Sequence, residues 1–187
     1  MMMVHQKKIQ IVTNLRNMKN ITIILLIAFS SLGQCQTGNI ITESEFDNIK
    51  INGISLLNIK NTLGEQNAME SLFGVPNDET IDPDGEFTNF EYNGFSIGFS
   101  ALLSGDLNQP ILGAFQITNG NYNISIQDIT FTIGDNISLL GNIVFNTTNN
   151  GSPSIVYMHC EGCNNFIIIR FNQLTNTITD IQYIEQS

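Results

Sequence analysis

Short runs of alternating or β-branched apolar residues recur along the chain from residue 49 onward. Side chains that alternate between two faces are typical of β-strands, and β-branched and aromatic residues favour that conformation. Asn-Gly pairs at Asn93 and Asn119 lie between such runs and predict tight hairpins. The pattern therefore predicts mostly antiparallel strands at residues 49–54, 87–92, 95–99, 111–117, 122–126, 129–133, 155–158, 166–171 and 178–184.

Two stretches have the spacing of an amphipathic helix instead. Residues 65–73 place apolar side chains three and four positions apart, and Gly74 and Pro76 follow as a helix stop. Residues 135–144 repeat this spacing, although Gly141 lies inside the pattern and weakens a helix. The sequence predicts a protein with many strands and two short helices.

Residues 1–35 have the layout of an export signal. Basic residues precede a short apolar run at 21–29, and small and polar residues follow it. A membrane span needs about 20 apolar residues, and this run is much shorter. Met18 and Lys19 already supply a start and a positive charge, so we expect translation to begin at Met18.

Two processing patterns fit the end of this leader. In the first, Gly33 and Cys35 are the small residues before the cut, and Gln36 becomes the mature N-terminus. In the second, residues 32–35 resemble a bacterial lipobox with Cys35 lipidated, although Gln34 stands where that motif has Gly, Ala or Ser. Both alternatives predict an exported protein of the periplasm, the outer membrane or the extracellular medium.

The chain becomes strongly acidic once the leader is removed. The full sequence has 7 basic and 17 acidic residues, and four of the basic residues lie before residue 36. The remaining chain has three basic and 17 acidic side chains, a net charge of about −14. This charge argues against nucleic acid or an anionic membrane surface as a partner. The only membrane contact that the sequence predicts is a lipid anchor at Cys35. Residues 36–48 are polar and acidic, and predict a tether.

The approaches to the two predicted helices are similar. Residues 63–65 read Leu-Gly-Glu and residues 133–135 read Ile-Gly-Asp, 70 positions later. Glycine permits a sharp turn there, and the acidic residue lies near a helix N-terminus, where it is favourable. Strands follow in both halves, which predicts two similar units at residues 49–120 and 121–187.

This arrangement resembles a known bacterial repeat. A strand that ends in apolar-Gly-acidic, a short helix that closes on Phe-Gly-Val-Pro at residues 73–76, and a meander of strands are similar to the repeat of the SmpA/OmlA outer-membrane lipoproteins. The same repeat occurs in tandem in the β-lactamase inhibitor protein. The second half departs from the pattern, because residues 145–147 read Phe-Asn-Thr at the helix exit. The resemblance, over about residues 50–185, implies an α+β fold of two similar units, each a short helix packed on a mainly antiparallel β-sheet. It also implies protein binding through a sheet face or loops.

The string Met-His-Cys-Glu-Gly-Cys at residues 158–163 has the sharpest chemical signature of the chain. It resembles the metal loop of heavy-metal-associated domains, in which two thiolates bind a soft ion. That loop precedes a helix, whereas residues 166–171 predict a strand. In an exported protein the pattern predicts a disulfide between Cys160 and Cys163 across a turn. A metal or redox site at Cys160 and Cys163, and free thiols, are the alternatives; His159 is interpreted as a solvated neighbour.

Carboxylates gather in one loop at residues 78–86. In a calcium-binding loop aligned with this segment, Thr80 occupies the first ligand position, which requires a carboxylate. Pro83 also lies inside that loop. Turn chemistry in a solvated loop explains the pattern better. We therefore interpret the acidic side chains as a contact surface for a protein partner with a basic surface; they are Asp78, Glu79, Asp82, Asp84 and Glu86.

The sequence offers no residue set for catalysis. The chain has 2 His, one of them in the leader, and no Gly-rich phosphate loop. We therefore predict a non-enzymatic, exported, acidic protein-binding module of the bacterial envelope, with no cofactor. The alternative is a thiol-based metal-binding or redox protein that uses the Cys160/Cys163 pair.

Overall fold

The computed structural model describes residues 38–147 and 151–185. The described residues all belong to one compact unit. The predicted export signal, the start at Met18 and the processing site at Cys35 lie outside the described residues. Within the described ranges, no helix is long and apolar enough to cross a membrane.

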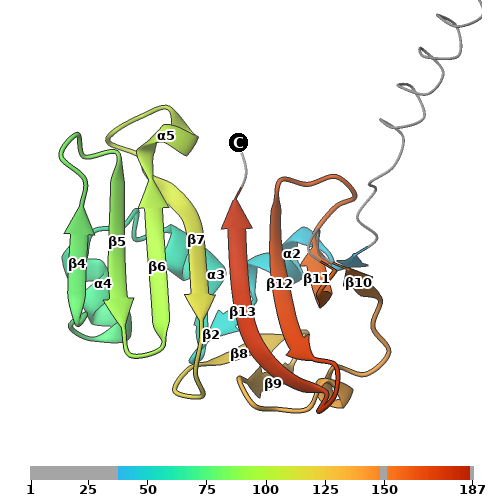
Figure 1. Ribbon diagram of the computed structural model, residues 1–187. Coiled ribbons are helices and arrows are strands. Elements are labelled where there is room, and N and C mark those ends of the chain that lie inside the picture. The colour runs from blue at the N-terminus through green and yellow to red at the C-terminus, as the bar shows by residue number, and fades with distance from the viewer. Residues whose placement is uncertain (1–37, 148–150, 186–187) are drawn as a thin grey trace, which may run out of the picture. The chain divides into compact units, whose positions relative to one another are not determined.

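A nine-stranded sheet runs through both halves of the described chain (Figure 1). All its pairings are antiparallel except that between β1 and β11, which is parallel. β10 pairs with β11 beside β1. The strands in spatial order are β1 (Asn39–Ile40), β11 (Pro153–Met158), β12 (Asn165–Asn172), β13 (Thr177–Glu185), β7 (Ile111–Ile117), β6 (Phe95–Ser100), β5 (Phe87–Tyr92) and β4 (Asp78–Ile81), with β10 at Phe145–Thr147.

A second, smaller sheet and several short helices complete the fold. The small sheet has the order β3 (Ile54–Ser55), β2 (Lys50–Ile51), β8 (Asn123–Ile126) and β9 (Ile129–Thr132). Figure 1 shows α2, α3 and α4 behind the large sheet, with β2, β8 and β9. The helices are α2 (Glu43–Asp47), α3 (Leu56–Lys60), α4 (Gln66–Phe73), α5 (Ala101–Ser104) and the 3-10 helix η1 (Ile137–Leu140).

The main core lies on the helix-covered face of the large sheet. Strand alternation directs Phe90, Phe95 and Tyr183 to this face, where each side chain is fully buried. Phe46 of α2 and Met69 of α4 belong to the same apolar cluster. The period-two pattern of the sequence therefore points the apolar positions of the central strands toward the helices.

The α+β class is confirmed, but the two similar units are not. One sheet joins strands from both predicted units, and β7 of the first half pairs directly with β13 of the second. This sheet is larger than a single predicted unit. The predicted helix at 135–144 is also reduced to η1, because Asn136 caps one turn and Gly141 ends it at a φ of +73°.

Residues 38–48 are folded, contrary to the predicted tether. A capping box starts α2: Glu45 N donates to Thr42 Oγ1 (3.2 Å), and Thr42 N donates to Glu45 Oε2 (2.8 Å). The latter bond lowers the pKa of Glu45. Ile41 and Phe46 are buried in the core. Two apolar anchors therefore fix a segment whose overall composition is acidic.

One of the two predicted hairpins is wrong. Asn93-Gly94 joins β5 to β6 as predicted, but residues 118–121 connect β7 of the large sheet to β8 of the small one. Asn119 Nδ2 instead donates to the carbonyl oxygen of Asn93 (3.3 Å). The two Asn-Gly turns therefore lie against each other, and one of them changes sheets.

Candidate functional site

The second face of the large sheet carries no helix across its central strands. Side chains that point away from the main core come from alternate positions of β5, β6, β7 and β13, and most are small or polar. In Figure 1 this face is turned toward the viewer, with α5 at its end. We call it the open face and define it by Asn89, Glu91, Ser96, Gly98, Ala114, Gln116, Asp180 and Gln182.

An apolar hollow of about 460 Å³ lies at the α5 end of the open face. Its floor is formed by the small residues Gly98, Gly113 and Ala114, and Leu102 and Leu103 of α5 form part of its wall. Gly98 pairs with Ala114 while Phe99 pairs with Leu112, so Gly113 is an extra, bulged residue. Large side chains on this floor would fill the hollow, so the small residues create it.

The hollow continues into a more polar depression of about 320 Å³ toward β13. Asn89, Gly98 and Ala114 line both depressions. Gln116 and Gln182 line the far part and offer amide groups to an extended chain. The two depressions together form a groove across four strands, apolar at one end and polar at the other.

Hydrogen bonds and an ion pair hold the carboxylates beside the polar end of the groove. Gln116 Nε2 donates to Asp180 Oδ1 (2.6 Å), and Arg170 forms an ion pair with the same carboxylate. Asn89 Nδ2 donates to Glu91 Oε1 (2.7 Å). These contacts fix the side chains, which gives the groove a defined polar rim.

The predicted acidic loop is in part a strand. Asp78–Ile81 forms β4 at the edge of the large sheet, and only the residues after it form a turn. The Asp82 carboxylate accepts hydrogen bonds from the backbone of Phe87 (2.6 Å) and Asp84 (3.3 Å). Asp82 therefore closes the turn, whereas Glu79 and Glu86 line a hollow of about 410 Å³ that also contains Glu65.

Replacing Asp82 by alanine is expected to lower the free energy of unfolding by about 1 kcal/mol, because two backbone N–H groups lose their acceptor. Asp84→Ala, at an exposed position of the same turn, is the matched control and is expected to change it by less than about 0.5 kcal/mol. Urea denaturation measures both. Equal effects of the two substitutions would contradict the assigned role of Asp82.

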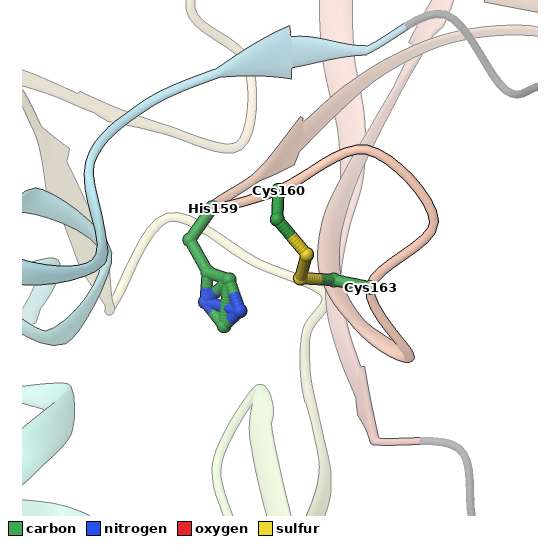
Figure 2. Close-up of side chains that lie close together, drawn as sticks. All are labelled: His159, Cys160 and Cys163. Carbon is green, nitrogen blue, oxygen red and sulfur yellow. A yellow bond between two sulfur atoms is a disulfide. The ribbon is translucent and has the colours of Figure 1, made fainter.

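A disulfide joins Cys160 and Cys163, as the sequence predicts for an exported chain. The disulfide spans the turn between β11 and β12. The Cα atoms of the two cysteines are 5.4 Å apart, and Cys163 N donates to Cys160 O (3.4 Å). Figure 2 shows His159 on the same turn. Contrary to the solvated interpretation, His159 is half-buried and its ring meets the Phe46 ring edge-on, with centroids 5.4 Å apart.

The described residues contain one group of side chains close enough to hold a metal ion. The ligand atoms of His159, Cys160 and Cys163 all lie within 4.8 Å of one another. The acidic loop forms no such group in the described part of the chain, so the calcium pattern finds no geometric support there. The structure thus brings together the predicted cysteine pair and a histidine.

The four tyrosine hydroxyls all have raised pKa values. Burial raises the pKa of Tyr92 to about 12, with smaller contributions from the nearby Tyr122 and from acidic residues. Burial also raises the pKa values of Tyr122 and Tyr157. For Tyr183, burial and a hydrogen bond to Glu185 raise the pKa further. These phenols therefore stay protonated at neutral pH.

Comparisons with known proteins show no family for this chain. No protein-family model matches it, and neither does any curated protein. A cysteine-rich secretory protein from Staphylococcus aureus matches at 9% identity and a TM-score of 0.38, over 64% of this chain and 42% of that one. An extracellular protein with an SCP domain from Bacillus anthracis matches at 8% identity and a TM-score of 0.41, over 82% and 49%. At TM-scores below 0.5, neither likeness supports an inference about this chain, which spans about half their length or less.

Proposed function

We propose that this chain is an exported, non-catalytic binding module that holds an apolar and cationic segment of another protein on its open face. The observation that carries the proposal is the apolar hollow on the sheet face opposite α2, α3 and α4. A monomer that exposes a defined apolar groove usually uses it for a ligand or partner. An extended segment can lay alternate side chains into such a groove.

Charge selects the kind of partner. The described residues contain all 17 acidic side chains of the chain and only three basic ones. Lys60 is paired with Asp47 (2.9 Å) and Arg170 with Asp180, which leaves Lys50 as the basic residue outside these pairs in the described ranges. Such a surface attracts a cationic partner and repels an anionic one.

An acidic hollow lies beside β4. It contains Glu65, Glu79 and Glu86, and it shares Thr88 and Phe99 with the apolar hollow. Glu79 pairs with Phe90, so its side chain lies on the helix-covered side of β4, whereas Asp78 pairs with Glu91 and lies on the open-face side. Of the acidic residues predicted as a contact surface, Asp78 is therefore the one that we assign to the open face.

Replacing Ala114 by arginine is expected to abolish this binding. Ala114 is exposed on the groove floor, so a large cation there fills the groove and repels a cationic segment without disturbing the core. Calorimetry with a peptide of about ten residues that alternates leucine and lysine provides the probe. We expect Ala114→Arg to weaken binding at least tenfold, by about 1.4 kcal/mol or more.

Leu174→Arg is the matched control, because it adds the same charge at a turn residue that is 94% exposed and outside the groove. We expect it to change the affinity less than about twofold. A peptide that alternates leucine and glutamate is expected not to bind. Equal losses in the two arginine variants would show that overall charge, and not the groove, captures the peptide.

A further inference from the structure

The turn between β11 and β12 has a chemistry that the binding function does not use. His159, Cys160 and Cys163 supply one imidazole and two sulfur atoms within 4.8 Å of one another. Figure 2 shows these three side chains on one turn. Imidazole and thiolate are the ligands that soft metal ions prefer.

We infer that this turn is a redox-gated site for Cu(I), closed as a disulfide and opened by a thiol reductant. In the oxidised form the two sulfur atoms are bonded to each other, and no thiolate is present. A dithiol reductant breaks that bond by giving two electrons and two protons, and becomes a disulfide itself. The two thiols then bind Cu(I) as thiolates and release both protons.

The geometry suits three-coordinate binding. A metal–sulfur distance near 2.3 Å places two ligand sulfurs about 3.5–4 Å apart, which a Cα–Cα distance of 5.4 Å across a tight turn permits. The three donors suit Cu(I), whereas a structural zinc site has four protein ligands.

The surroundings hold the histidine in place and admit reductant and metal. Phe46 is 1% exposed and contacts the His159 ring edge-on, which limits the motion of the imidazole. Cys160 is exposed and Cys163 half-buried, so both sulfurs can be reached from solvent. One fixed ligand and two accessible ones form a site that responds to the redox state of the compartment.

The test is a Cu(I) titration of the full chain under anaerobic conditions, with the coloured chelator bicinchoninate as competitor. We expect the reduced protein to withdraw one equivalent of Cu(I) and the oxidised protein none. His159→Phe keeps a ring against Phe46 but removes the nitrogen ligand. Because outer-shell changes alone cost about 10–100-fold in affinity, this loss of a direct ligand is expected to cost at least about 100-fold.

The chain supplies a matched control, since the sequence has 3 Cys and one of them lies outside the turn. Cys35→Ser is expected to keep the full equivalent, while Cys160→Ser with Cys163→Ser loses it. Alkylation of the reduced protein with iodoacetamide blocks the thiols in a chain that has already folded, and circular dichroism checks each variant. Equal binding by oxidised and reduced protein, no binding by the reduced form, or loss of binding in Cys35→Ser would overturn the inference.

Discussion

Replacing Phe95 by alanine is expected to lower the free energy of unfolding by about 3–5 kcal/mol, the range for removing a buried phenylalanine ring. Phe95 is 1% exposed on β6. Its ring centroid lies 4.8 Å from that of Tyr122 and 5.1 Å from that of Phe73. Tyr92 and Phe115 complete the aromatic cluster. Alanine would leave a cavity among these four rings.

Chemical denaturation of the variant measures this loss. Phe87→Ala is the matched control, because Phe87 lies at the end of β5 and is 47% exposed. Its replacement is expected to cost less than about 1.5 kcal/mol, since much of its surface is already in contact with water. A loss below about 1 kcal/mol for Phe95→Ala would mean that the aromatic cluster does not form the centre of the core.

Replacing Gly64 by alanine is expected to cost about 2–4 kcal/mol. Gly64 has a φ of +70°, where an L-residue is strained by about 1–2 kcal/mol. A Cβ atom there would also lie 2.8 Å from Cγ of Phe99, a ring that is 1% exposed. The ring cannot move away without disturbing the core, so overpacking adds to the backbone strain.

Gly134 provides the matched comparison, because it occupies the corresponding position in the second half of the predicted repeat. It has a φ of +95°, but a Cβ atom there would meet nothing within 4 Å. Gly134→Ala is therefore expected to cost only the strain, about 1–2 kcal/mol. Thermal or urea denaturation of both variants separates the two effects, and equal losses would refute the close contact between Gly64 and Phe99.

Local pattern predicts strands well in this protein because each central strand has one face in the core. Strands β5 and β7 begin and end at the residues that the sequence indicates, 87–92 and 111–117. The pattern predicts one strand at residues 49–54, but Asn52 and Gly53 adopt positive φ values and turn the chain between β2 and β3. Two-residue strands such as these are too short to leave a periodic signal.

Sheet membership depends on contacts that are distant in sequence. The motifs around Gly64 and Gly134 are similar over three residues, yet Gly64 packs against Phe99 and Gly134 faces open space. Similarity over three residues is therefore not enough to predict two units with the same packing. The Asn119-Gly120 turn has hairpin composition, but β7 pairs with β13, more than 60 residues later. Pairing of this kind is decided by the buried faces of the whole sheet.

The sequence predicts the cysteine site in part but does not predict the groove. The cysteine pair is visible from its spacing, but the half-buried position of His159 depends on Phe46, which lies in a segment predicted as a tether. The groove was missed, because its floor comes from two strands. Gly98, Gly113 and Ala114 carried the available signal, since small residues inside strands often mark a close approach of a ligand or backbone.

Amide chemical-shift mapping with the leucine–lysine peptide tests the central claim most directly. The proposed function predicts shifts on the open face, strongest at Gly98, Gly113 and Ala114 and extending toward Gln116. It also predicts that these shifts vanish in Ala114→Arg and persist in Leu174→Arg. Shifts confined to the Cys160–Cys163 turn, or scattered over the acidic surface without a maximum in the groove, would contradict the claim that the open face is the binding surface.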